Sequence, residues 1–341
     1  MNYLLIVIYS LLSFIFFNYF FRKYNFLIDR KVLPHKSFTS TTATPVIGGL
    51  IIMFYLIIFN HDLKFVYFCS LIFLLGLFSD LIVLKKPLTK FILQLIVVLS
   101  FLFFYDLKIL STKIFFLDYF LDNKIFSIFF TLFCLLILIN GSNFIDGVNT
   151  LLCGYYLLVL GVIFYLSLNN INININFKII NLEEFLLILF MIFLLNFFSK
   201  LYLGDSGAFL ISFIVGYYLI NIANSNQVIS PIFVVLLLWY PAFENFFSIF
   251  RKFYNKSHPS NPDNFHLHQL LFIFLKKRLN TNANFINSLT GNVINFFNFI
   301  TFCFGINFFT STKYLIVLVF VNIFFYLSTY FFLIKNLKNN T

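Results

Sequence analysis

The chain has 341 residues, of which 61% are hydrophobic and 10% are charged, and Phe alone occurs 56 times. A soluble domain does not bury that much apolar surface, so the composition excludes an ordinary globular protein and predicts an all-α polytopic membrane protein. The formal net charge is +11. The basic residues lie in short loops between apolar runs, where membrane topology and anionic lipid explain them, and we expect no nucleic-acid partner.

The apolar runs predict about eleven transmembrane helices, some of them slightly short. They lie near residues 3–21, 46–60, 65–80, 89–106, 125–142, 150–168, 183–199, 206–224, 228–250, 284–306 and 314–334. The first run is long and ends in Arg22-Lys23, which indicates a retained span. Because no internal repeat and no second soluble domain is evident, residues 1–341 are expected to form a single integral-membrane domain.

The Lys and Arg residues indicate how these helices are oriented. With the N-terminus outside, 17 of the 23 basic residues fall in inner segments. The other six are Lys64, Lys108, Lys113, Lys124, Lys178 and Lys313. Because positive residues are retained on the cytoplasmic side, this split predicts an outer N-terminus and a cytoplasmic C-terminus. The unusual polar residues then collect at the cytoplasmic face, and they are Asp80, Asn140, Asn143, Asp146, Asp205, Glu244, Asp263, His266 and His268.

The first polar segments in chain order lie at the second and third predicted spans. Thr44-Pro45-Val46-Ile47-Gly48-Gly49 opens the second span, and its paired glycines favour close packing of two backbones. Ser79-Asp80 ends the third span, and Lys90 and Gln94 lie one turn apart at the start of the next. Anchoring at the positive side of the membrane explains the nearby lysines, whereas a carboxylate at the end of an apolar helix is costly unless it is paired or functional.

The segment from Asn140 to Gly154 begins where a long apolar run stops. Asn140, Asn143 and Asp146 are three residues apart, so in helical geometry they lie on one face. A carboxylate and two amides at the mouth of a membrane helix form a site for a cation and a polar ligand. The alternative is an ordinary helix cap followed by a turn, because Asn, Ser and Gly also favour helix ends.

The segment Gly204-Asp205-Ser206-Gly207 stands just before another apolar run. It predicts a flexible turn with exposed backbone N–H groups, a carboxylate and a hydroxyl. That combination suits a phosphate bound through Mg²⁺ at a helix N-terminus. An ordinary Asp or Ser helix cap is the alternative.

The longest inner loop follows Glu244 and Arg251 and contains Asp263, His266 and His268. No Cys is nearby, and the hard carboxylates expected on the same face suit Mg²⁺ better than zinc. Histidine and basic side chains facing an anionic diphosphate are therefore the favoured interpretation of this loop.

Together these segments resemble the polyprenyl-phosphate N-acetylhexosamine-1-phosphate transferases, a membrane superfamily that also includes phospho-N-acetylmuramoyl-pentapeptide transferase. Five motifs of the family are matched in the right order between residues 28 and 270. The matches are Pro45 to Gly49; Asp80 with Lys90 and Gln94; Asn140, Asn143, Asp146 and Gly147; Gly204 to Gly207 with Asn196 upstream; and Asp263, His266 and His268.

The chain departs from the family pattern at three positions. Ser79 replaces the first residue of an Asp pair, Asn149 stands where an acidic residue is often found, and Gln269 replaces the last His of the loop motif. Any mechanism that needs an Asp at position 79 is therefore in question. The muramoyl-pentapeptide branch typically carries consecutive histidines and ten spans, so the chain is more similar to the sugar-phosphate branch.

The resemblance implies a transferase that moves N-acetylhexosamine-1-phosphate from a UDP-sugar, UDP-N-acetylglucosamine first, to undecaprenyl or another polyprenyl phosphate and releases UMP. It implies Mg²⁺ as cofactor, with Mn²⁺ as the alternative, and a site on the cytoplasmic face of a bacterial inner membrane. This would be the first membrane step of a cell-envelope glycan such as lipopolysaccharide, and a homodimer is left open.

The family motifs also imply roles for particular residues. Asp80, Asp146 and Asp205 would be catalytic, and Asp205 and Asp146 would ligate the metal. The implied substrate-binding residues are Lys90, Asn140, Asn143, Asn196, Arg251, His266 and His268.

Three alternatives stay open on the sequence. The first is the muramoyl-pentapeptide reaction. The second is a transporter of lipid-linked sugars, which should show repeats and ionisable groups near the middle of the bilayer. The third is an inactive membrane scaffold, which the residues at 79 and 149 favour and which should tolerate loss of Asp205.

Overall fold

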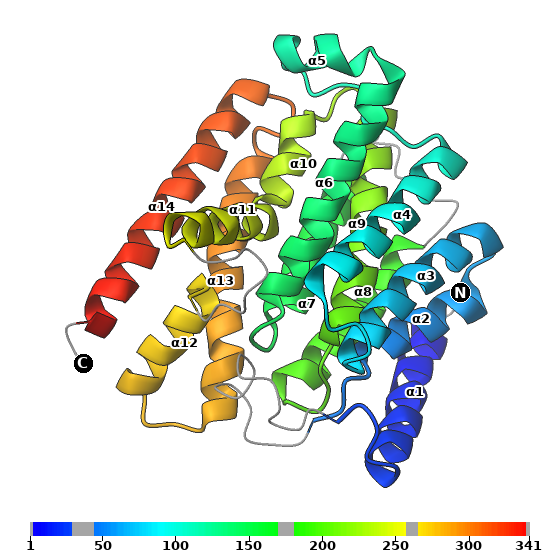
Figure 1. The fold of residues 1–341 in the computed structure, drawn as a ribbon, viewed down its shortest axis with the longest axis vertical. Coiled ribbons are helices and arrows are strands. Elements are labelled where there is room, and N and C mark those ends of the chain that lie inside the picture. The colour runs from blue at the N-terminus through cyan, green and yellow to red at the C-terminus, as the bar shows by residue number, and fades with distance from the viewer. Residues whose placement is uncertain (1–2, 29–43, 170–180, 257–264, 339–341) are drawn as a thin grey trace.

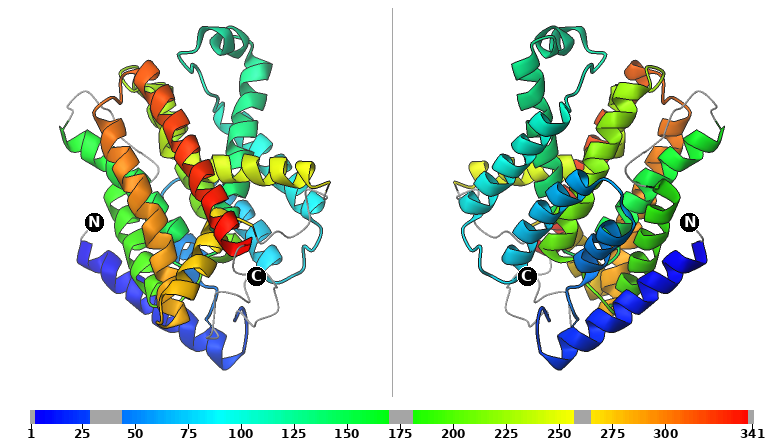
Figure 2. Two further views of the ribbon diagram at one scale, coloured as in Figure 1. Left: turned by 90° about the vertical axis from the view of Figure 1, so that its left-hand side faces the viewer. Right: turned by 90° about the vertical axis from the view of Figure 1, so that its right-hand side faces the viewer.

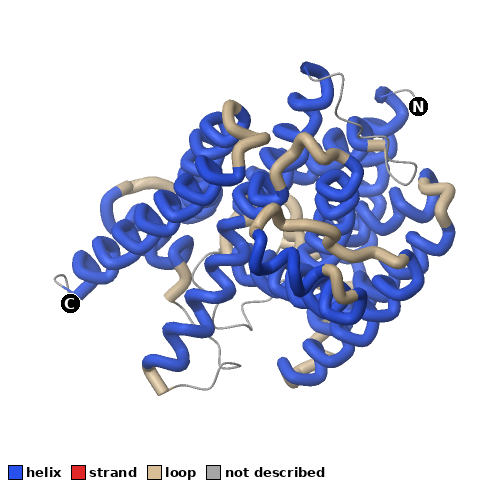
Figure 3. Tube along the Cα trace, turned by 90° about the horizontal axis from the view of Figure 1, so that it is seen from above, coloured by secondary structure: helices blue, strands red, loops and turns tan. Residues whose placement is uncertain are grey.

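The computed structural model describes residues 3–28, 44–169, 181–256 and 265–338. Across these ranges the backbone forms fourteen α-helices joined by loops, with isolated β-bridges but no strand (Figure 3). The all-α fold class predicted from composition is confirmed.

The helices follow one another along the chain in numerical order. They are α1 (Tyr3–Lys23), α2 (Gly48–Phe59), α3 (Leu63–Asp80), α4 (Pro87–Tyr105), α5 (Phe115–Leu121), α6 (Lys124–Ile145), α7 (Leu151–Asn169), α8 (Leu182–Phe197), α9 (Gly204–Ser225), α10 (Pro231–Leu237), α11 (Trp239–Tyr254), α12 (Leu267–Arg278), α13 (Ala283–Ile306) and α14 (Thr312–Lys338). Figure 1 shows that most of the long helices run side by side as a bundle.

The predicted count of eleven membrane-spanning helices can be compared with the lengths and composition of the described helices. Within the described ranges, eight helices are long and apolar enough, and the bent pair α10–α11 would make a ninth. All eleven predicted stretches contain helix, but α2 has 12 residues and α8 has 16. Those lengths reach about 18 and about 24 Å, less than a hydrocarbon core of about 30 Å. The fold is that of a polytopic membrane protein, while the count of eleven and the orientation stay predictions.

The stretch 228–250, predicted as one span, is bent in the structure. It is broken between α10 and α11, which meet at an angle of 69°, and α11 lies across its long neighbours (Figures 1 and 2). Pro241 lacks an N–H and so cannot donate to the carbonyl of Leu237, four residues earlier. The hydroxyl of Tyr155 donates to that carbonyl instead, at 2.8 Å.

Glycine makes room for the broken region. A Cβ atom on Gly141 of α6 would lie 2.1 Å from the carbonyl oxygen of Pro241. Only a residue without a side chain lets the two backbones approach this closely. The bend therefore rests on Pro241, on the hydroxyl that replaces its missing hydrogen bond, and on Gly141.

The centre of the bundle is α9. In its most apolar stretch 89% of the residues are buried, compared with 22% for α1, α4 and α14. A Cβ atom on Gly49 of α2 would lie 2.6 Å from the backbone nitrogen of Gly207, and one on Gly76 of α3 would lie 2.4 Å from the Cα of Ser206. The expectation that Gly48-Gly49 serves close packing is confirmed, and it is the first turn of α9 that the helices α2 and α3 approach.

Candidate active site

The polar segments of the sequence meet at one end of the bundle. α3 ends there at Asp80, α4 begins there at Pro87, α6 ends there at Ile145 and α9 begins there at Gly204. A side-chain hydrogen bond of 3.1 Å from Asn140 to Gln94 joins the end of α6 to the first turns of α4. The expectation that these residues share one face of the protein is therefore met in space.

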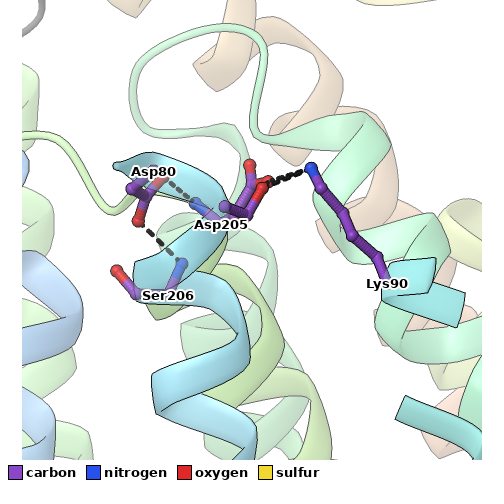
Figure 4. A network of polar contacts seen from close by, with 5 residues as sticks. Asp80, Lys90, Asp205 and Ser206 are labelled. Atoms are coloured by element: carbon purple, nitrogen blue, oxygen red, sulfur yellow. Dashed lines mark hydrogen bonds and ion pairs between the residues drawn. The ribbon is translucent and has the colours of Figure 1, made fainter. Parts of the chain in front are cut away.

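Asp80 caps the N-terminus of α9 from a different helix. Its Oδ1 accepts from the backbone nitrogen of Asp205 at 2.9 Å and its Oδ2 from that of Ser206 at 3.0 Å (Figure 4). Gly204 has a φ of +70°, and a Cβ atom on it would lie 2.8 Å from both carboxylate oxygens of Asp80. Glycine is needed here both for the backbone conformation and for the close approach.

This cap changes one expectation from the sequence. The N–H groups of the Gly-Asp-Ser-Gly segment were expected to be exposed and available to a phosphate, but those of Asp205 and Ser206 donate to Asp80. The segment is also the first turn of α9 and not a flexible turn. A carboxylate at a helix N-terminus is stabilised by the helix dipole as well as by the two hydrogen bonds.

Asp205 points to the opposite side, toward α4. Its Oδ2 lies 3.4 Å from Nζ of Lys90, and the two side chains are 20% and 27% exposed (Figure 4). The hydroxyl of Ser79 donates to the same Oδ2 and accepts from Lys90. Asp205, Ser79 and Lys90 therefore form a partly exposed cluster of one carboxylate, one hydroxyl and one ammonium group.

The loop before α9 is held in place by two other segments. Tyr202 pairs with the segment before α2, because its N–H donates to Pro45 at 2.9 Å and its carbonyl accepts from Gly48 at 3.0 Å. The side chain of Asn196 accepts from the N–H of Thr150 at 2.5 Å and donates to the carbonyl of Leu201 at 2.9 Å. Asn196 is buried, so the structure places it behind the site as a support for this loop.

The Asn-Asp segment at the end of α6 lies between two groups of functional side chains. Asn140 contacts Gln94, Asn143 is half-buried one turn later, and Asp146 ends the helix as its C-cap. The segment is thus a helix end, as the alternative interpretation expects, whereas a cation site there stays a prediction. Asn149 is buried, and its side chain donates to the hydroxyl of Ser199 at 2.8 Å, so at this position the chain uses an amide to join two loops.

The histidine loop packs against the end of α6. The rings of His266 and Phe144 lie 5.3 Å apart, and a Cβ atom on Gly147 would lie 2.2 Å from Nε2 of His268. Nδ1 of His266 lies 2.8 Å from Oε1 of Glu244 on α11. Two motifs that are more than a hundred residues apart in the sequence are thereby brought into contact.

His268 differs from His266 in its surroundings. It is fully buried, and among the described residues neither ring nitrogen has a hydrogen-bond partner. Burial, with the nearby His266 ring as a second cause, lowers the pKa of His268 to about 3, although Glu244 acts in the opposite direction. The ring of His268 is therefore neutral at neutral pH.

Arg251 lies at the far edge of this region. Its guanidinium lies over the rings of Phe247 and Tyr330, at 5.5 and 5.7 Å, and donates to the Tyr330 hydroxyl at 3.3 Å. It is thus directed toward α14. Asp263 lies outside the described residues.

The fit of a metal ion depends on the oxygen donors. In the described part of the chain, no three His, Cys, Asp or Glu side chains gather in a metal-binding group. Asp205 still has the chemistry that a hard cation prefers, because it is a partly exposed carboxylate whose Oδ1 makes no hydrogen bond to a described residue. Asp80 is less suited, since each of its oxygens already accepts a backbone N–H.

Three side chains at the site were not among the predicted site residues. Ser79 was noted as a departure from the family pattern, yet it links Asp205 to Lys90. Glu244 could have been predicted from the sequence, because a carboxylate in an apolar stretch is costly unless it is paired or functional. Tyr326, which donates to Glu244 at 2.7 Å, had no signal as one of 19 tyrosines in the chain.

Comparison with known proteins agrees with this arrangement. The family model for glycosyl transferase family 4 matches residues 63–223, a range that contains the Asp80, Lys90, Asn140, Asp146 and Asp205 positions. Over 255 residues the chain is 28% identical to the undecaprenyl-phosphate alpha-N-acetylglucosaminyl 1-phosphate transferase of Thermotoga maritima, which covers 73% of this chain and 74% of that protein.

A second relative is the probable undecaprenyl-phosphate N-acetylglucosaminyl 1-phosphate transferase of Bacillus subtilis. It is 28% identical over 138 residues, which cover 40% of this chain and 37% of that protein. The matched family model and the two relatives agree with the ordered motif residues: the chain is similar to the proteins of glycosyl transferase family 4.

Proposed function

We propose that the protein transfers N-acetylglucosamine-1-phosphate from UDP-N-acetylglucosamine to undecaprenyl phosphate or a similar polyprenyl phosphate and releases UMP. The reaction takes place at the cytoplasmic face of a bacterial inner membrane and begins the synthesis of a cell-envelope glycan. The names of the two relatives support the substrates, and the orientation rests on the distribution of Lys and Arg residues.

The observation that carries the proposal is the cluster of Asp205, Ser79 and Lys90 at the mouth of the bundle. Both substrates are anionic, so transfer between them requires fixed positive charge close to a carboxylate that can hold a cation. Lys90 supplies the charge and Asp205 the carboxylate, and Asp80 fixes Asp205 by capping α9. All of these groups lie at the ends of helices that are otherwise apolar, where a soluble diphosphate can reach a membrane lipid.

In the proposed reaction an oxygen of the polyprenyl phosphate attacks the phosphorus that carries the sugar. The bond from this phosphorus to the oxygen bridging the diphosphate breaks, and UMP leaves with the electron pair. Negative charge grows on the UMP oxygen, and the ammonium group of Lys90 is placed to offset it. Asn140 and Asn143 would contact the nucleotide, and Nε2 of His266 would contact the diphosphate or the sugar.

We place Mg²⁺ at Asp205, with Asp146 as the second carboxylate of its surroundings. When bound, the ion would neutralise charge on the diphosphate and polarise its phosphorus–oxygen bonds. Asp80 has a positioning role in this scheme. His268 is 0% exposed and His266 is 6% exposed, so we assign the substrate contact to His266 and a packing role to His268.

Helix α11 suits the lipid substrate. One face is buried and polar, with Glu244, Ser248 and Lys252, whereas the other face is apolar and exposed, with Phe250 and Phe253. A helix that separates polar from apolar surroundings in this way can guide a lipid whose phosphate must reach a polar site while its chain stays among hydrocarbon.

The test is UMP release by the purified full chain in detergent with Mg²⁺, undecaprenyl phosphate and a set of UDP-N-acetylhexosamines. We expect release that needs lipid and donor, that stops when EDTA removes the metal, and that falls by at least about a thousandfold in Asp205→Asn. UDP-muramoyl-pentapeptide is included as a donor, because its use would favour the muramoyl-pentapeptide reaction instead.

The matched control is Asp118→Asn. Asp118 is also a half-buried carboxylate that accepts several hydrogen bonds, from Ser111 and Thr112, but it lies on α5 at the other end of α6 from the site. Its activity should equal that of the wild type. If folded wild-type protein binds the lipid but no donor yields UMP, the transporter or scaffold interpretation takes precedence.

A further inference from the structure

Glu244 is the most deeply buried carboxylate near the site, with an exposed fraction of 0%. A buried charge is costly unless both of its oxygens are satisfied. Both are satisfied here: Oε1 lies 2.8 Å from Nδ1 of His266, and Oε2 accepts from the hydroxyl of Tyr326 at 2.7 Å. One carboxylate of α11 thus joins the N-cap residue of α12 to the middle of α14.

The direction of the first hydrogen bond follows from this pairing. A carboxylate only accepts, and Tyr326 already donates to one of its oxygens, so the proton between Glu244 and His266 belongs to Nδ1 of the ring. Nε2 is then the ring nitrogen that remains for a substrate, and it makes no hydrogen bond to a described residue. The backbone N–H of His266 is also held, by the side chain of Gln269 at 3.2 Å, so ring and backbone are fixed together.

Among the described residues, the charged and titratable groups near His266 include Glu244 on α11, Tyr326 on α14 and His268 on α12, whose ring is stacked 5.6 Å away at an angle of 11°. Lys252 lies over the neighbouring Phe144 ring, 5.9 Å from its centroid. His268 makes no hydrogen bond to His266. Glu244 is therefore the group that can set the orientation of the His266 ring.

We propose that Glu244, held by Tyr326, is a positioning residue for His266. It keeps the Nδ1 proton directed into the protein and presents Nε2 to the sugar-phosphate donor. The effect on catalysis rests on the proposed function, whereas the effect on the ring does not. The three helices concerned, α11, α12 and α14, all lie outside residues 63–223 that match the family model, so this support is built from the part of the chain that follows the match.

The first experiment determines which nitrogen of the His266 ring carries the proton. The chain has five histidines, so nitrogen-15 spectra of histidine-labelled protein in lipid can be assigned by the loss of one signal set in His266→Asn. We expect a single Nδ1-protonated form of His266 in the wild type and in Glu244→Gln, because the amide oxygen of Gln still accepts. In the double variant Glu244→Met, Tyr326→Phe we expect a mixture of the two neutral tautomers.

The second experiment measures UMP release by the same variants. Glu244→Met, Tyr326→Phe should lower kcat/KM for the UDP-sugar by about 10- to 100-fold, and Glu244→Gln by less than about threefold. In a His266→Asn background the double substitution should cause no further loss beyond about twofold, because its effect passes through the ring that has been removed. KM for the polyprenyl phosphate should stay unchanged.

The chain offers a matched control for the burial of a Glu–Tyr pair. Glu184 on α8 is also buried and accepts from the hydroxyl of Tyr55 at 3.1 Å. It lies at the opposite end of α8 from Asn196, about 18 Å along the helix axis. Glu184→Met, Tyr55→Phe should show a similar change in thermal stability but wild-type kcat/KM and an unchanged His266 signal.

Several results would overturn the proposal. One is an Nδ1-protonated His266 that persists in Glu244→Met, Tyr326→Phe, and another is a loss of activity that adds in full to that of His266→Asn. A wild-type protein that releases no UMP with any donor would count against the proposed function alone, because the nitrogen spectra still decide whether Glu244 fixes the ring.

Discussion

Two carboxylates near the start of α9 have different surroundings although they lie on facing helices. Asp80 accepts two backbone N–H groups, whereas Asp205 faces an ammonium and a hydroxyl group. The motifs implied that both residues are catalytic and that Asp205 ligates the metal, but they did not indicate that Asp80 caps α9. The cap depends on contact between residues 125 apart in the sequence, and no local pattern reports such a contact.

Asp80→Ala tests whether UMP release depends on the cap that Asp80 provides to α9. It removes the charged acceptor of two N–H groups, so we expect a loss of about 0.5–2 kcal/mol in unfolding free energy and a strong loss of UMP release. The measurement is thermal unfolding in detergent beside the UMP assay.

The control for Asp80→Ala is Asp62→Ala. Asp62 caps its own helix, α3, by accepting from Lys64 and Phe65 at 3.0 Å each. The Asp62→Ala variant should lose a similar unfolding free energy and keep wild-type UMP release. Full UMP release by Asp80→Ala would show that the first turn of α9 does not need this cap.

His268 makes stability depend on pH. Its pKa is about 3 in the folded protein and about 6.5 in an unfolded chain, so between these values the unfolded state binds more protons. The stabilising contribution is complete above about pH 6.5 and is lost as the pH falls toward 3, by up to about 1.4 kcal/mol per pH unit.

His268→Gln should therefore give a shallower fall of the unfolding midpoint between about pH 6.5 and pH 4. His266, Glu244 and Arg251 remain in both proteins, so the difference between the two curves isolates His268. Parallel curves for wild type and variant would mean that His268 is already protonated, or exposed, in the folded state.

Among the elements, α9 and the broken pair α10–α11 show which features of the helices could be predicted from the sequence. The apolar runs predicted where helices lie, since length and hydropathy decide this locally. They did not predict the bend at Leu238, because it depends on Pro241 together with Gly141 and Tyr155 from other helices. Pro241 itself was the available signal, and a proline inside a predicted helix favours a kink.

The packing of α2 against α9 can be tested at one glycine. A Cβ atom on Gly49 would lie 2.6 Å from the nitrogen and 2.9 Å from the Cα of Gly207, so Gly49→Ala must push the two backbones apart. We expect a loss of about 1–3 kcal/mol and reduced UMP release, because Asp205 lies in the same turn.

Gly161→Ala on α7 is the matched control, since nothing lies within 4 Å of the position that its new methyl group would occupy. Alanine favours helix over glycine by about 1 kcal/mol, so this variant should be as stable as the wild type or more so. Equal stability of Gly49→Ala and wild type would show that the two helices can separate without cost.

For the whole molecule, the order of motifs predicted which residues meet, and the structure brings Asp80, Lys90 and Asp205 together as expected (Figure 4). It adds that Asn196 lies behind the site and that Arg251 is directed toward α14. Side-chain direction depends on packing among several helices, so motif spacing alone could not supply it. Sidedness and a homodimer stay predictions.

Cysteine labelling tests the sidedness. In a background that lacks the exposed Cys303, Asp122→Cys on the loop after α5 should react with a membrane-impermeant maleimide in intact cells. Lys277→Cys at the end of α12 should react only in inverted vesicles. Both positions are exposed, and the reverse pattern would overturn the outer N-terminus and the cytoplasmic site.

The link from Tyr326 through Glu244 to His266 also bears on how the protein is made. Of the helices described, α14 is the last to emerge during synthesis. The Asp205 cluster can assemble while the ribosome is still translating, but the His266 ring gains its full support only when α14 has been inserted. In a nascent chain the Asp205 cluster therefore forms before the support of the His266 ring is complete, and that support waits for the insertion of α14.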